Sequence, residues 1–225
     1  MSRSTDSLIR ELSRGLQPVR RVPPLHRVAA LAAALALATA AIALVTWGLN
    51  ETFRGLNPEP RYWVAIAGLL SFAAGGAAAA LGSTVPGNDP LIRGGVAAMV
   101  AGAMLTLLGS ALFLARISAG EPAGSFWSAL SLVCLGRSSL VAIPAAALLT
   151  LFAARGFPHR PWLTVGFGTL GLVAFGALPV TMSCGSESIF HIVFAHVLAP
   201  ATAGLGLWAV LWLLYALLRS RREQS

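Results

Sequence analysis

Residues 28–47 read VAALAAALALATAAIALVTW, a run of twenty positions without a charged side chain. An α-helix rises about 1.5 Å per residue and the hydrocarbon core of a bilayer is about 30 Å thick, so this run predicts a membrane-spanning helix. A polar tail of 27 residues precedes it. The tail and the apolar run are both longer than those of a cleavable signal peptide, and we therefore expect the segment to be retained.

Five further apolar segments follow the first one. They lie at residues 62–81, 94–115, 138–154, 162–182 and 188–218. A shorter apolar lead-in, residues 126–135, precedes the fourth segment. Strands are not expected, because the sequence has no ten-residue alternation of polar and apolar side chains. Helices satisfy their own backbone hydrogen bonds, which lipid cannot do, so we predict an all-α fold: a polytopic membrane bundle of six transmembrane helices.

The composition agrees with this interpretation. Hydrophobic residues make up 56% of the 225 positions and charged residues only 11%, with a mean hydropathy of +0.76. A soluble domain carries about 25% charged residues, so soluble enzymes and disordered proteins are excluded at the outset. The connecting loops are short and leave no room for a separate soluble domain. We expect three parts: a cytoplasmic tail at 1–27, a membrane domain at 28–218 and a basic tail at 219–225.

The net charge of +8 is informative through its placement. All sixteen basic residues are arginines, and twelve fall on the side of the two termini while four, Arg54, Arg61, Arg116 and Arg137, fall on the other. Because arginine and lysine are concentrated in cytoplasmic loops, this bias predicts that both termini are cytoplasmic. The basic excess is thereby explained as a topology signal, and we expect no direct nucleic acid binding.

The N-terminal tail contains an amphipathic pattern. Apolar residues recur at helical spacing at Leu8, Ile9, Leu12 and Leu16, and polar residues cover the opposite face. An apolar stripe on an isolated cytoplasmic helix needs a partner. That partner is either the membrane surface, with Arg20 and Arg21 attracted to anionic lipid, or a groove on a soluble protein.

Two cysteines, Cys134 and Cys184, fall on the outer side in this topology. In a bacterial inner membrane that side is the oxidising periplasm. Three interpretations stay open: a structural disulfide, a reduced pair that responds to oxidants or thiophilic metals, or two small apolar residues of the bundle.

Two histidines follow in the sixth segment. Cys184 and His191 are seven residues apart and share a face if the helix begins early enough. His196 lies five residues after His191, which in a regular helix points it about 140° away. All three could join Cys134 in a soft-metal site, and the alternative is that the histidines are packing residues.

Arg137 precedes the fourth segment. A helix that begins near Phe126 would place this charge deep in lipid at a high energetic cost. We therefore predict that the helix begins after Arg137, which anchors the interface, and that residues 126–135 form an interfacial or re-entrant stretch that carries Cys134.

Catalytic signatures are missing from the sequence. It contains no HExxH, GxSxG, P-loop or paired-carboxylate motif, and no Asp or Glu lies in the middle of a span. A proton-coupled transporter usually needs such a carboxylate. We do not expect an enzyme, and the alternative function is a small transporter or membrane-enzyme subunit that uses His191, His196 and Arg137.

Three motifs together resemble a known family, the six-span bacterial anti-sigma factors similar to NrsF (negative regulator of sigma F). The first is LIREL at 8–12 followed by LQPVRRVPP at 16–24. The second is CLGR at 134–137, which leads into a span with Pro144, and the third is SCGSES at 183–188 before His191 and His196. Family members often carry an aromatic residue before the last of these histidines, where this chain has Ala195.

The resemblance implies a role for each part. The tail would hold an extracytoplasmic-function-type sigma factor at the inner membrane of a bacterium, through Leu8, Ile9, Leu12, Leu16, Pro18, Val19, Arg20 and Arg21. Cys134 and Cys184 would sense periplasmic metal or oxidative stress and cause release of the sigma factor. No resident cofactor is implied, beyond transient binding of a soft metal at the cysteines.

Overall fold

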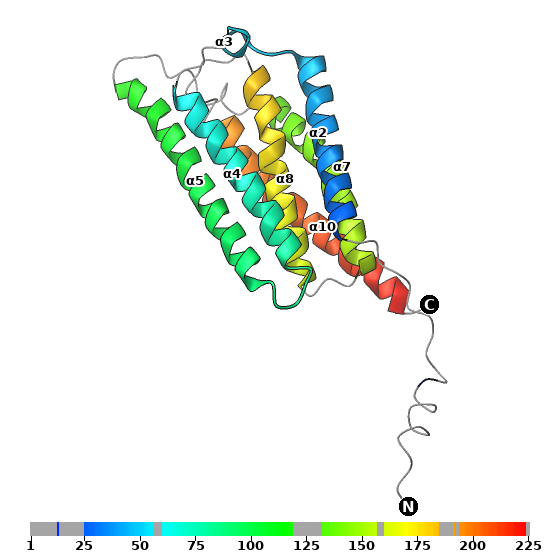
Figure 1. Cartoon of the computed structure of the whole chain (residues 1–225). Coiled ribbons are helices and arrows are strands. Elements are labelled where there is room, and N and C mark those ends of the chain that lie inside the picture. Colours follow the sequence, from blue (N-terminus) through cyan, green and yellow to red (C-terminus); the bar gives the residue numbers. More distant parts are fainter. Residues whose placement is uncertain are drawn as a thin grey trace, which may run out of the picture.

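The computed structural model describes residues 13, 25–55, 60–118, 132–156, 160–184, 191 and 194–223. Over these ranges the secondary structure is helical, and six helices are long and apolar enough to cross a membrane, which confirms the expected number of spans (Figure 1). The six are α2 (Leu25–Trp47), α4 (Pro60–Gly82), α5 (Asp89–Ser118), α7 (Leu132–Gly156), α8 (Pro161–Ser183) and α10 (Ala199–Glu223). A short helix, α3 (Glu51–Arg54), follows α2, and a π-helix, η1 (Phe194–Leu198), leads into α10.

Helix α8 is the centre of the bundle (Figure 1). It packs against α2, α4, α7 and α10. Its buried positions are almost all glycine, alanine, threonine or valine, and they run along its whole length. In lipid, helices associate through close packing rather than through a hydrophobic driving force, so small side chains on α8 allow four neighbours to approach it closely.

Glycines set the contact between α4 and α5. A Cβ atom on Gly75 of α4 would lie 2.5 Å from the carbonyl oxygen of Gly95, and one on Gly102 of α5 would lie 2.5 Å from the backbone nitrogen of Phe72. The two helices therefore approach each other more closely than larger side chains at these positions would allow.

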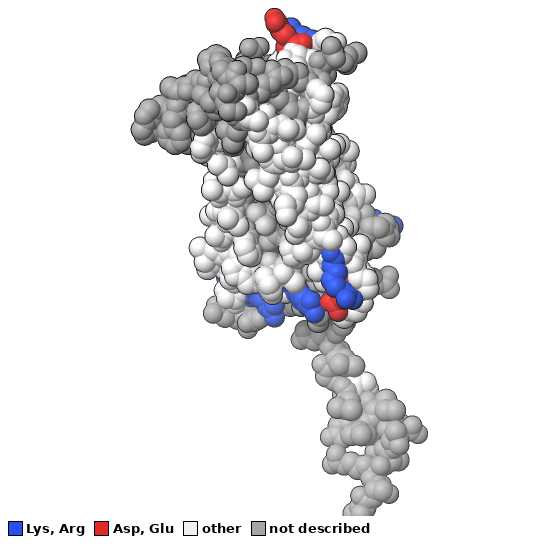
Figure 2. Space-filling view, turned by 90° about the vertical axis from the view of Figure 1, so that its left-hand side faces the viewer, with Lys and Arg blue, Asp and Glu red and all other residues white. Residues whose placement is uncertain are grey.

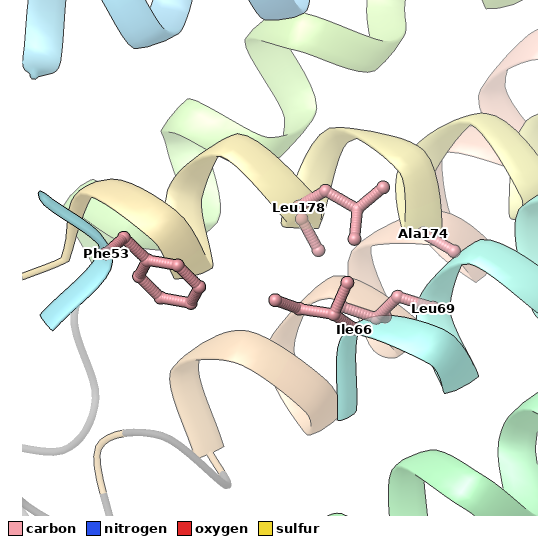
Figure 3. Close-up of a cluster of buried hydrophobic side chains, with 6 residues drawn as sticks. Phe53, Ile66, Leu69, Ala174 and Leu178 are labelled. Carbon is pink, nitrogen blue, oxygen red and sulfur yellow. The ribbon is translucent and has the colours of Figure 1, made fainter. Parts of the chain in front are cut away.

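A cluster of buried apolar side chains joins α3, α4 and α8 (Figure 3). Phe53 of α3 lies beside Leu178 of α8, and Ile66 and Leu69 of α4 face the same helix near Ala174. Helix α3 was not expected from the sequence. It forms because the Asn50 Oδ1 atom accepts a hydrogen bond from the Phe53 backbone N–H at 3.0 Å, which caps the helix, and because Phe53 is buried.

Two helices begin before the apolar segments that the sequence indicates. Helix α5 begins at Asp89, five residues before the segment 94–115, since proline is well tolerated and an acidic side chain is favourable in a first helical turn. Helix α7 begins at Leu132, so Cys134 and Arg137 lie inside a helix rather than before one. The Arg137 guanidinium lies 4.8 Å from the centre of the Trp47 ring, which provides a favourable contact for its charge without ending the helix.

Basic side chains gather mainly at one end of the bundle (Figure 2). This is the end where α2 begins and α10 ends (Figure 1). It includes Arg160 at the start of α8, whose guanidinium lies 3.3 Å from a carboxylate oxygen of Asp89. The assignment of this end to the cytoplasm stays a prediction of the positive-inside rule.

The glycine contact gives a matched test, because Gly94 and Gly95 are adjacent. A Cβ atom at Gly95 would lie 2.5 Å from the Ala79 backbone nitrogen, whereas one at Gly94 would meet no atom within 4 Å. Gly95→Ala should destabilise the bundle by about 1–3 kcal/mol through overpacking. Gly94→Ala should leave stability unchanged or raise it by up to about 1 kcal/mol, since alanine favours helix. Thermal unfolding of the detergent-solubilised protein by circular dichroism measures both, and equal midpoints for the two variants would contradict the packing argument.

Candidate metal or redox centre

Four side chains with metal-binding chemistry converge at the end of the bundle opposite the start of α2. They are Cys134, Cys184, His191 and His196, and their ligand atoms all lie within 4.8 Å of one another. Cys134 comes from the first turn of α7, Cys184 follows the last residue of α8, and His196 belongs to η1. Residues far apart in the sequence are therefore brought to one point by the bundle.

His191 links the two cysteines. Its Nε2 atom lies 3.2 Å from the Cys184 Sγ atom and 3.6 Å from the Cys134 Sγ atom. Its ring also meets the His196 ring edge to face, with centroids 5.3 Å apart. Cys134, His191 and His196 are buried and Cys184 is half-buried, so the centre is largely shielded by protein.

Thr181 of α8 fixes the orientation of His196. The Thr181 hydroxyl donates its hydrogen to the Ala177 carbonyl at 2.9 Å. Its oxygen therefore accepts from the Nδ1–H of His196, 3.3 Å away. A neutral histidine held in this way keeps its lone pair on Nε2, and a hydrogen-bonding partner of this kind is typical of metal-ligating histidines.

Both histidines reach the same centre although they are five residues apart. In a regular α-helix His191 and His196 would point about 140° apart, which was the expectation from their spacing. Their rings instead lie 5.3 Å apart, so the expected divergence is wrong. His196 belongs to the π-helix η1, whose backbone departs from regular α-helical geometry.

Cys184 does not lie on the final helix with His191. It is the C-terminal cap of α8, with an extended backbone, and its N–H donates to the Val180 carbonyl at 2.9 Å. The contact between Cys184 and His191 therefore comes from the return of the chain after α8, not from a shared helix face.

Two of the ligand separations lie near those of a tetrahedral metal ion of the soft or borderline class. Bond lengths of about 2.3 Å to sulfur and about 2.0–2.1 Å to nitrogen place sulfur and nitrogen ligands about 3.6 Å apart around zinc. The two separations from His191 Nε2 are 3.2 and 3.6 Å. Two thiolates and two imidazoles are a donor set for Zn²⁺, Cd²⁺ or Cu⁺. The same cysteines, which are not joined in a disulfide, could instead form one by losing two electrons and two protons to an oxidant.

The remaining predicted binding residues belong to the N-terminal tail. The tail residues Leu8, Ile9, Leu12, Leu16, Pro18, Val19, Arg20 and Arg21 lie outside the described residues. Thr181, whose hydroxyl contacts His196, was missed, because a single threonine near the end of a span carries no distinguishing sequence signal.

Comparison with known proteins gives one match. The family model NrsF, described as negative regulator of sigma F, matches residues 12–215. No curated protein and no solved structure matches the chain.

Metal binding tests the geometry of the centre. The purified protein should bind one Cd²⁺ per chain, with a thiolate-to-cadmium absorption band in the ultraviolet, and Cys134→Ser should lose the band. Thr181→Val should weaken affinity by roughly 10–100-fold, the usual effect of removing a second-shell partner. Ser183→Ala is the matched control, because the Ser183 hydroxyl bonds only the nearby Val180 carbonyl at 3.3 Å. Undiminished cadmium binding in Cys134→Ser would contradict a centre built from both cysteines.

Proposed function

The chain belongs to the NrsF family of negative regulators of sigma F, and from this premise we propose that it is a membrane anti-sigma factor of the bacterial inner membrane. The family name implies a sigma factor as partner and a regulatory rather than catalytic role. The proposed partner is a sigma factor of the extracytoplasmic-function type, held through the N-terminal tail. The observation that carries the proposal is the family match over residues 12–215, which spans part of the tail, five of the six long helices in full, most of α10 and both cysteines.

The tail supports sequestration by its chemistry and position. Its apolar stripe, Leu8, Ile9, Leu12 and Leu16, needs a partner surface. It leads directly into α2, which begins at the arginine-rich end of the bundle (Figure 2). If that end is cytoplasmic, as the arginine bias predicts, the tail lies in the compartment where sigma factors bind RNA polymerase.

The cysteine–histidine centre supports a sensor on the other side of the membrane. The 23 residues of α2 separate the two ends of the bundle by about 34 Å. A stimulus at the centre would therefore arrive from the periplasm, without contact with the tail. The convergence of four ligand side chains favours a thiophilic metal as the stimulus, because disulfide formation would need only the two cysteines. Binding would release the thiol protons to water.

The tail assignment is tested by co-purification. Leu8→Ala combined with Leu12→Ala should abolish recovery of the sigma factor with the tagged membrane protein, because it removes half of the apolar stripe. Glu11→Ala combined with Ser13→Ala removes two polar side chains outside the stripe and should leave recovery intact. Retention of the sigma factor by the leucine double variant would show that the tail stripe is not the binding surface.

The sensing assignment is tested in cells with a reporter for the released sigma factor. Cys134→Ser and Cys184→Ser should each abolish induction by cadmium, while the protein still inserts into the membrane and still binds the sigma factor. An unchanged response in the double cysteine variant would remove the cysteines from the mechanism. Induction by peroxide but not by metal would identify oxidation as the stimulus.

A further inference from the structure

The segment after α2 is bonded to the end of α8 that carries Cys184. The Asn50 side-chain Nδ2 atom donates to the Cys184 carbonyl at 2.7 Å, and the Asn50 backbone N–H donates to the Met182 carbonyl at 3.0 Å. Asn50 lies three residues beyond the last residue of α2, Trp47. The backbone of one proposed ligand is thus attached to the helix that carries the tail.

Trp47 makes a second connection, to the other cysteine. Its side chain packs against the buried cluster of Cys134, Val180 and Ala195. The Arg137 guanidinium, one turn along α7 from Cys134, lies over its ring at 4.8 Å. The last residue of α2 therefore packs against α7, which carries Cys134, and against the end of α8, which Cys184 follows.

The first half of α2, next to the tail, is held differently. A groove of about 480 Å³ lies between it and helices α4, α7 and α8, and the α2 side of the groove includes Ala29, Ala32 and Ala33. Farther along, α2 buries the small side chains of Ala36, Ala40 and Ala43, and the Thr39 hydroxyl lies 3.1 Å from the Val141 carbonyl of α7. A helix that borders a groove at one end can tilt as a unit when its other end moves.

We propose that Asn50 and Trp47 transmit the state of the cysteine–histidine centre to α2, and through α2 to the N-terminal tail. Ligand binding draws the start of α7, the end of α8 and η1 into one coordination geometry. The end of α2 follows, because Asn50 is bonded to the Cys184 backbone and Trp47 packs against the buried cluster that contains Cys134. The regulatory consequence rests on the proposed function, since it needs a sigma factor on the tail. The protein would have two conformations that differ in the position of α2. The metal can shift the equilibrium between them only to the extent that it binds one conformation more tightly than the other.

Asn50→Asp removes the hydrogen bond to the Cys184 carbonyl and keeps the cap of α3. An aspartate keeps the oxygen that caps α3 through the Phe53 N–H, but it lacks the N–H that donates to Cys184. We expect the purified variant to bind one Cd²⁺ and to retain the sigma factor as the wild-type protein does. Its cadmium induction of the sigma reporter should fall by about five-fold or more, the lower range of allosteric coupling. Asn88→Asp makes the same chemical change at the opposite end of the bundle and should respond normally.

Trp47→Leu provides an independent variant, because it removes the ring beneath Arg137 and keeps an apolar side chain. Its induction should also fall while cadmium binding persists. Wild-type induction in both Asn50→Asp and Trp47→Leu would overturn the inference. So would loss of cadmium binding in Asn50→Asp, since Asn50 would then only position a ligand. Failure of the wild-type protein to bind a sigma factor is a separate result, which would overturn the proposed function.

Discussion

The close approach of four helices to α8 is the constraint on which the rest of the structure depends. Helix α8 has small side chains on nearly every side, so α2, α4, α7 and α10 can all pack against it. In lipid such packing replaces the hydrophobic effect as the source of helix association. Because α8 is central, the residues at its end, Thr181 and Cys184, are placed where α7, η1 and the segment after α2 also meet.

The cysteine–histidine centre follows from that meeting point. Cys134 reaches it from α7, Cys184 from the cap of α8, and both histidines from the chain that leads into α10. A π-helix, which is frequently found at functional sites, turns His196 toward the centre. The cost of this irregular turn is offset by the contact of the His196 Nδ1–H with Thr181, which also leaves the ring nitrogen needed for a metal. Ala195, next to it, is buried against Cys134 in the small space that this packing leaves.

The same geometry offers a physical basis for regulation across the membrane. The proposed sensing would have to connect a stimulus on one side with a partner on the other, and α2 lies between the centre and the tail in the chain. Its last residue, Trp47, packs beside the centre, and Asn50 in the next segment is bonded to the Cys184 carbonyl, whereas its first half borders a groove. This asymmetry favours movement of α2 as a unit.

The amino-acid sequence by itself determined the six apolar segments and their helical character. Lipid cannot satisfy backbone hydrogen bonds, so a spanning segment must satisfy its own, and runs of about 20 apolar residues are easily recognised. The sequence also singled out both cysteines and both histidines. Only the tertiary structure decided that these four side chains share one site. The π-turn at His196, the start of α7 before Arg137 and the bond from Asn50 to Cys184 arise from contacts between distant segments, and regular helical periodicity carries no information about such contacts.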